Sequence, residues 1–177
     1  PGAIVPTGVR ATSLTLRDDD TPPINPNGRT LSFRSAKQST SPSGVIVPTW
    51  NGPSDPTTTG GGTLVVYDGD GGSGVVTIPL PQSGWKRIGT ATNPGYKYSD
   101  SKRLLGPVQS VMLRNGTLTV RGKVEDLYPL TAAPQGTMAL RLTVGAETQF
   151  CAAAPAKSPS TTNDTTRRFV GERNTPA

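Results

Sequence analysis

Hydrophobic and polar residues alternate along several short stretches of the chain. Residues 12–17 (TSLTLR) and 30–34 (TLSFR) each place every second side chain on one apolar face. The inward side chains are Leu14, Leu16, Leu31 and Phe33. A period of two residues is typical of a strand with one buried face, so we expect two neighbouring strands of a sheet.

Two further pairs of alternating segments are separated by turn residues. Residues 63–67 (TLVVY) and 74–78 (GVVTI) flank the glycine-rich sequence DGDGGS. Residues 108–114 and 117–121 flank Asn115 and Gly116, and an Asn-Gly pair suits the positive φ angles of a type I′ turn. Both pairs are therefore predicted to form β-hairpins.

The remaining apolar segments are also of strand length. Residues 84–88 and 95–98 are short candidates, and residues 137–144 (TMALRLTV) form the longest alternation, which we place centrally in a sheet. We find no helix-length amphipathic segment and no solenoid or propeller repeat. Eight to ten short strands predict an all-β fold, a single β-sandwich of the Greek-key or jelly-roll type.

Composition supports this fold class and suggests one domain. The 177 residues include 21 Gly and 18 Pro, and only 17% are charged, a profile that disfavours helices and favours strands joined by long loops. We predict an extended N-terminal arm over residues 1–10, a β-sandwich domain over residues 11–152 and an extended C-terminal tail over residues 153–177.

The charge is positive and unevenly distributed. The formal net charge is +6, and the sequence pI is about 9.8. Between residues 85 and 123 only Asp100 opposes a group of cations, namely Lys86, Arg87, Lys97, Lys102, Arg103, Arg114, Arg121 and Lys123. This region is either a solvated, solubilising face or a binding surface for an anionic partner. Because no nucleic-acid signature accompanies it, we expect no nucleic acid.

The residues that most often carry catalysis are scarce. The chain has no histidine, which excludes a His-based triad and the commonest general base. Its single cysteine, Cys151, cannot close an internal disulfide and is interpreted as a small buried hydrophobe, although an intermolecular bridge remains open. We predict no catalytic residue, no enzyme activity and no cofactor.

Two acidic clusters are weak candidates for calcium. One is the triplet at residues 18–20, and the other is Asp68 with Asp70 in the predicted hairpin loop. Neither has the spaced downstream Glu of a complete calcium loop, so turn chemistry explains both better. No metal site is predicted.

Aromatic residues near the basic region suggest a ligand platform. Trp85, Tyr96 and Tyr98, with Lys86 and Lys97 beside them, form a set that could stack on sugar rings. Filling the core is the competing use, because a small domain with nine aromatic residues buries most of them.

The terminal segments are candidates for docking on another subunit. Residues 152–177 are rich in Pro, Ser and Thr, a composition that stays disordered unless it packs on a surface. Donation of an extended segment to a sheet edge would use Ile4 and Val5, or Phe169 and Val170, as anchors. The alternative is that both ends fold back on their own domain.

Three short motifs stand out within residues 64–152, namely Gly84-Trp85-Lys86, Gly95-Tyr96-Lys97-Tyr98 and Phe150-Cys151-Ala152. In these features the middle of the chain resembles a family of secreted bacterial β-rich proteins of unknown function. The resemblance implies export and an extracellular, β-rich role, and it implies no catalytic residue. Family members often carry a second cysteine near the hairpin, which this chain lacks, so no disulfide is implied.

We expect a secreted, extracellular or cell-surface protein. The sequence has no apolar run long enough for a membrane helix, and it begins at Pro1 instead of Met, which suggests a processed chain. The leading functional hypothesis is a bacterial homopolymer, a filament or surface array built by docking of a terminal segment. The alternative is a module that binds carbohydrate or an anionic polymer, and a third hypothesis is a viral coat or decoration protein.

Overall fold

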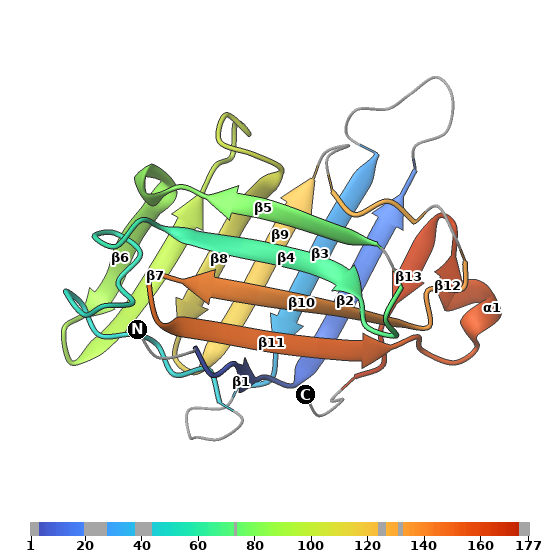
Figure 1. Cartoon of the computed structure of the whole chain (residues 1–177), viewed down its shortest axis with the longest axis horizontal. Helices are drawn as coiled ribbons and strands as arrows, with labels where there is room; N and C mark the ends of the chain where they lie inside the picture. The colour runs from blue at the N-terminus through green and yellow to red at the C-terminus, as the bar shows by residue number, and fades with distance from the viewer. Residues whose placement is uncertain are drawn as a thin grey trace.

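The chain folds into two large β-sheets packed face to face, as the computed structural model in Figure 1 shows. The structure describes residues 4–19, 28–37, 44–72, 74–123, 127–130 and 133–173. The prediction of an all-β, sandwich-like fold is confirmed. Within the described residues, helical structure is confined to η1 (Gln82–Gly84) and α1 (Ser160–Asn163).

The two sheets differ in size. The five-stranded sheet contains, in spatial order, β1 (Thr7–Gly8), β11 (Thr148–Pro155), β10 (Thr137–Val144), β4 (Gly62–Asp68) and β5 (Val75–Leu80). The eight-stranded sheet contains β12 (Asp164–Thr165), β13 (Arg168–Val170), β2 (Ala11–Asp18), β3 (Arg29–Ser35), β9 (Thr117–Lys123), β8 (Val108–Arg114), β7 (Asn93–Ser99) and β6 (Trp85–Thr90). In Figure 1 the five-stranded sheet lies in front, and its strands cross those of the rear sheet.

The predicted sheet neighbours pair as expected. Leu14 of β2 lies opposite Phe33 of β3, and Leu16 lies opposite Leu31. All four side chains are at most 2% exposed and belong to a single core between the two sheets. Alternation therefore directs the apolar half of each strand inward and leaves the other half on the outer face of the sheet.

The predicted hairpin at Asn115-Gly116 is confirmed. Asn115 and Gly116 have φ angles of 50° and 71°, and they join β8 to β9. The position of β10 is also confirmed, since this strand lies in the middle of the five-stranded sheet. The Asn-Gly pair was sufficient to predict the hairpin, and the strict alternation was sufficient to predict the position of β10.

The two ends of the described chain belong to the sandwich, which differs from the predicted boundaries at residues 10 and 152. Thr7 and Gly8 pair with β11, and the chain then crosses to the other sheet as β2. At the other end β11 continues to Pro155, and β13 pairs with β2. The described parts of the predicted arm and tail thus supply strands to the same fold.

Candidate functional site

The outer face of the eight-stranded sheet is strongly basic. Strand alternation buries Leu16, Phe33, Val120 and their neighbours, and it turns the intervening residues outward. We call this surface the basic face, and its exposed cations are Arg17, Arg34, Lys86, Lys97, Arg114, Arg121, Lys123 and Arg168. No outward position of the described strands of this sheet carries Asp or Glu.

Cross-strand register places hydroxyl groups on both sides of two arginines. In one row, Ser13 of β2 and Thr119 of β9 lie opposite Arg34 of β3. These three residues form the first hydroxyl–arginine–hydroxyl row. The second row is Ser32 of β3, Arg121 of β9 and Ser110 of β8.

The basic face is hollowed where these rows lie. One hollow of about 630 Å³ is lined by Ser13, Ser32, Phe33, Arg34, Lys97, Ser99, Ser101, Gln109, Ser110, Val111, Met112, Thr119 and Arg121. A second hollow of about 430 Å³ is lined by Thr12, Ser13, Arg34, Ser35, Lys37, Thr117 and Arg173. Because both contain Ser13 and Arg34, we describe them together as the basic groove. Among the residues that the structure describes, no acidic one lines either part.

The cations of the groove are not neutralised within the described chain. The ion pairs Arg29–Asp18, at 3.2 Å, and Arg87–Asp55, at 2.7 Å, lie elsewhere. Arg34, Lys97 and Arg121 make no ion pair with any other described residue. Their charge is therefore available to a ligand.

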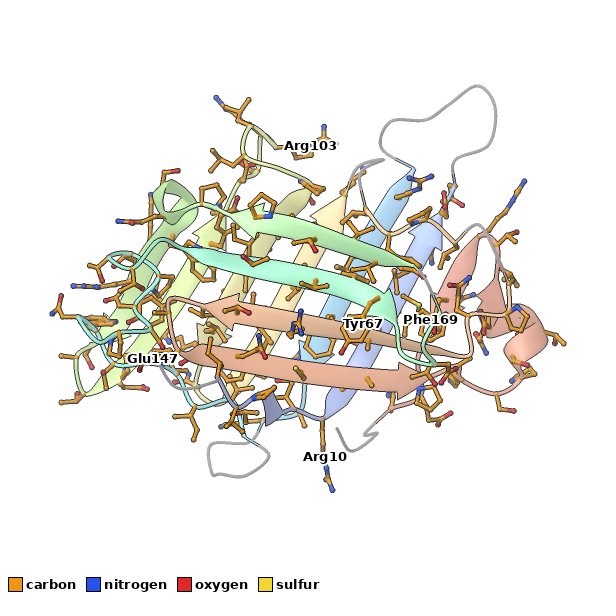
Figure 2. The ribbon with its side chains drawn as sticks, in the orientation of Figure 1. Arg10, Tyr67, Arg103, Glu147 and Phe169 are labelled. Carbon is orange, nitrogen blue, oxygen red and sulfur yellow. The ribbon has the colours of Figure 1, made fainter. Side chains whose placement is uncertain are left out.

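The opposite face of the molecule has a different character. The outward residues of β4, β10 and β11 are mostly small or uncharged, and Tyr67 lies among them (Figure 2). Arg141 is the one charged outward residue in the five described strands of that sheet. It lies opposite Cys151, whose pKa is raised by burial although Arg141 acts in the opposite direction. The positive field is thus concentrated on the basic face.

Of the two uses that the sequence left open for Trp85, Tyr96 and Tyr98, the structure shows core filling and no platform. Trp85 is 4% exposed, and Tyr96 and Tyr98 are 0% exposed. The Trp85 and Tyr98 rings pack edge to face at 5.5 Å, and the Trp85 indole N–H donates to the Leu80 carbonyl oxygen at 3.0 Å. None of the three rings presents a face to a sugar. Only the predicted lysines, Lys86 and Lys97, lie on the outer surface, directly opposite each other.

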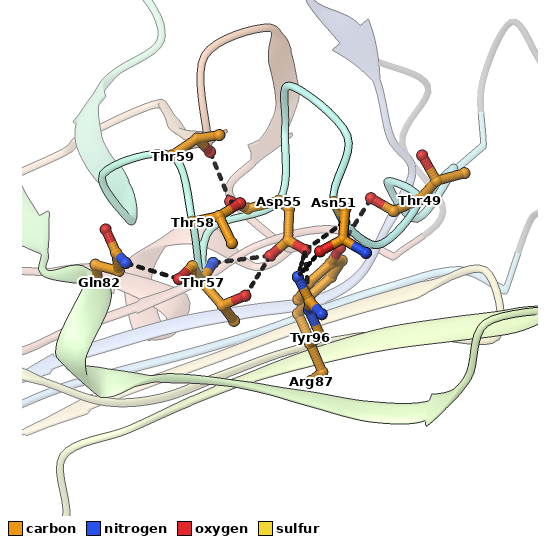
Figure 3. A network of polar contacts seen from close by, with 9 residues as sticks. All are labelled: Thr49, Asn51, Asp55, Thr57, Thr58, Thr59, Gln82, Arg87 and Tyr96. Atoms are coloured by element: carbon orange, nitrogen blue, oxygen red, sulfur yellow. Dashed lines mark hydrogen bonds and ion pairs between the residues drawn. The ribbon is translucent and has the colours of Figure 1, made fainter.

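A polar network fixes the long loop that precedes β4 (Figure 3). Asp55, which is 0% exposed, accepts hydrogen bonds from the backbone N–H groups of Asn51 and Thr57 and from the Thr57 hydroxyl. Arg87 of β6 donates from Nε at 3.0 Å. Burial alone would raise the pKa of Asp55, but these hydrogen bonds outweigh it, and the pKa is lowered. The network satisfies its own members and holds the loop against the sheet.

Tyr96 is held by the same loop. Its hydroxyl donates to the Thr49 carbonyl oxygen at 3.1 Å (Figure 3). Burial, together with the charge of Asp55, raises the pKa of the Tyr96 phenol. Tyr96 therefore remains neutral and serves the packing of the loop.

The predicted docking residues divide into two groups. Phe169 is 0% exposed, pairs with Leu16 and belongs to the chain's own core (Figure 2). Val170 is half-buried beside it in β13. Ile4 and Val5, in contrast, are 37% and 83% exposed. Phe169 and Val170 thus pack within their own chain, whereas Ile4 and Val5 lie at the surface.

The acidic candidates show turn geometry. The backbone N–H of Asp70 donates to Asp68 Oδ1 at 2.8 Å, which is a local turn contact. Asp18 is buried and pairs with Arg29, and Asp20 lies outside the described residues. No group of three His, Cys, Asp or Glu residues in the described ranges is arranged to hold a metal ion.

The fold and the groove together define an all-β protein of two sheets with one basic outer face. Comparison with protein-family models, with curated proteins and with solved structures finds no match for this chain. Among the described helices, none is long and apolar enough to cross a membrane. The function is therefore argued from the geometry of the basic groove.

Proposed function

We propose that this protein binds an acidic polysaccharide along the basic groove and acts as a non-catalytic binding module. The observation that carries the proposal is the concentration of eight exposed cations, with no acid among the outward residues of the described strands, on the outer face of one sheet. Such a field attracts polyanions over a distance and concentrates them at the surface. This role fits the secreted location that the sequence predicts.

Some cations of the basic face lie where they repel each other and destabilise the sheet, which a face that serves only solubility does not require. Lys86 lies directly opposite Lys97, and Arg17 lies directly opposite Arg168. Like charges at directly opposite positions destabilise a sheet, whereas solubilising surfaces usually intersperse both signs. A bound polyanion removes this repulsion, so ligand binding accounts for a pattern that solubility alone does not require.

The chemistry of the groove favours a sugar polymer over a nucleic acid. No outward position of the described strands of the eight-stranded sheet carries Phe, Tyr or Trp, so bases have no stacking platform. Serine and threonine hydroxyls line the groove instead. They can exchange hydrogen bonds with sugar hydroxyls and donate to anionic groups.

Assembly into a filament or array has less support from the structure. A donated C-terminal segment would have to withdraw Phe169 from its own core, where the side chain is fully buried. Ile4 and Val5 are exposed, so the assembly hypothesis now depends on the N-terminal segment alone. Polymers that persist after deletion of residues 1–6 would exclude that form of it.

The test compares two triple variants with equal net charge. Arg34→Ala/Lys97→Ala/Arg121→Ala removes the three cations of the larger hollow, and Lys37 and Arg173 of the second hollow remain. The matched control is Arg10→Ala/Arg141→Ala/Lys157→Ala, whose exposed cations are not part of the basic face; Arg10 lies at the lower margin of the molecule in Figure 2. Each lowers the formal net charge from +6 to +3, since three cations are lost.

Binding is measured on dextran sulfate and polygalacturonate, with unmodified dextran as the neutral polymer. The groove variant is expected to lose about a hundredfold in affinity, because three charge-assisted contacts at about 1 kcal/mol each are removed. The control should change much less, and added salt should weaken wild-type binding. Equal losses in the two variants, or no binding to either acidic polymer, would contradict the proposal.

A further inference from the structure

The groove contains two matched sets of donors. Each set is one hydroxyl–arginine–hydroxyl row, centred on Arg34 or on Arg121. The flanking hydroxyls belong to Ser13, Thr119, Ser32 and Ser110, and all six side chains line the same hollow. The register of four antiparallel strands, β2, β3, β9 and β8, therefore repeats one donor arrangement at two adjacent places.

The four hydroxyl groups are free to act on a ligand. Ser13, Ser32, Ser110 and Thr119 make no side-chain hydrogen bond with another described residue. Neighbouring hydroxyls differ in this respect. The Thr12 hydroxyl donates to the Arg34 carbonyl oxygen at 2.9 Å, and the Ser35 hydroxyl donates to the Ala36 carbonyl oxygen. Thr12 and Ser35 also line the groove, but their hydroxyls are used in contacts with the backbone, whereas those of the two rows are not.

Donor counting distinguishes between classes of anion. The guanidinium fork contacts two oxygens in a bidentate arrangement. A carboxylate or a phosphodiester has only two free oxygens, so the fork contacts both of them. A sulfate or phosphate monoester has three, and the third oxygen is left for a further donor. The hydroxyls beside Arg34 and Arg121 supply that donor on either side.

We propose that the two rows are subsites for tetrahedral monoester groups, of the sulfate type, carried by one polymer. This assignment rests on the proposed function, and it specifies the anion that the groove recognises. Arg34 and Arg121 lie on neighbouring strands and are offset by two residues along them. Standard sheet dimensions place their Cα atoms roughly 8 Å apart. Two ester groups at about that interval can therefore occupy both subsites at once.

The remaining groove residues complete the site. Met112, which is 39% exposed, lies opposite both Thr119 and Lys97, so it provides an apolar floor beside the subsites. Lys97 is three strands from Arg34, roughly 14 Å by the strand spacing. At that distance it attracts the polymer without belonging to either subsite.

The test uses one polymer backbone with different anions. Dextran sulfate, dextran phosphate monoester and carboxymethyl dextran are compared at equal charge density, and single-stranded DNA is added as a phosphodiester. A three-oxygen ester is expected to bind at least tenfold more tightly than carboxymethyl dextran and DNA. The sulfate and phosphate arms show which ester is preferred. Equal affinity for esters and carboxylates would overturn the inference while the proposed function stands, and absence of binding to all acidic dextrans would overturn the proposed function itself. Tighter binding to DNA would overturn both.

Hydroxyl variants test the donor count directly. Ser32→Ala/Ser110→Ala keeps Arg121 and the net charge, so the affinity for the ester polymer should fall about tenfold while carboxymethyl dextran is nearly unaffected. Thr63→Ala/Thr77→Ala removes two hydroxyls from the other sheet and serves as the control. Unchanged ester preference in the Ser32→Ala/Ser110→Ala variant would contradict the role of the hydroxyls.

Discussion

Replacement of Phe169 by alanine tests whether the C-terminal strand belongs to its own molecule. Phe169 is 0% exposed and lies in the common core, opposite Leu16 of β2. Phe→Ala substitutions in a packed core cost about 3–5 kcal/mol, which combines lost transfer free energy with the cavity left behind. For a chain of this size, that loss lowers Tm by roughly 6–20 °C.

The measurement is urea unfolding at several protein concentrations. Val170→Ala is the matched control, because Val170 is the next residue of the same strand and faces the other side. It should cost far less than Phe169→Ala, and Phe169→Leu should lie between them. If the strand packs within one molecule, the free energy of unfolding is independent of concentration. A strand exchanged between two copies would instead add about 1.4 kcal/mol for each tenfold increase. That result, or a loss below about 1 kcal/mol in Phe169→Ala, would refute the reasoning.

Two further predictions concern loops held by buried carboxylates. Asp55→Ala should lower the free energy of unfolding by about 2–4 kcal/mol, less than for a wholly buried pair because the Arg87 side chain is 30% exposed. Folding lowers the pKa of Asp55 from its ordinary 3.8, so the contribution of Asp55 to stability is complete above pH 3.8 and is lost as the pH falls through the folded-state pKa. The acid unfolding curves of the wild type and of Asp55→Ala should therefore converge at low pH, and parallel curves would contradict the assignment. The Asp100 carboxylate accepts hydrogen bonds from the backbone N–H groups of Leu104 and Leu105 at 2.9 and 2.6 Å. Asp100→Ala should therefore speed tryptic cleavage in the loop between β7 and β8. An unchanged rate would show that the carboxylate does not hold this loop.

Much of the fold was predictable because its signals are local. The hairpin of β8 and β9 follows from Asn115-Gly116 between two alternating runs, and β10 follows from eight residues of strict alternation. The pairing of Leu14 with Phe33 and of Leu16 with Leu31 follows from two matching patterns. In each case the side-chain period and the turn residues were enough to set the register.

The strands whose partners were not predicted are those that pair with distant segments. β11 carries Ala152 and Ala154 on its inner face, and alanine gives a weak strand signal. β13 has three residues and becomes a strand only because β2 offers it an edge. Neither segment contains a pattern from which its pairing could be predicted.

The candidate site was predicted only in part, for a similar reason. The excess of cations between residues 85 and 123 was visible, and Lys97 and Arg121 belong to it. Arg34 and Ser13 join them through pairing of β2, β3 and β9, whose residues are far apart in the sequence. The use of the aromatic residues stayed open because composition near a basic segment does not show which strand face they occupy.

The most direct test of the central claim is to locate the bound polymer by amide NMR titration with dextran sulfate. The proposed function predicts that the largest shift changes fall on β3, β8 and β9, around Ser32, Arg34 and Arg121, and that they recede as salt is added. Changes concentrated on β4, β10 and β11, or no saturable changes at all, would contradict polysaccharide binding on the basic face.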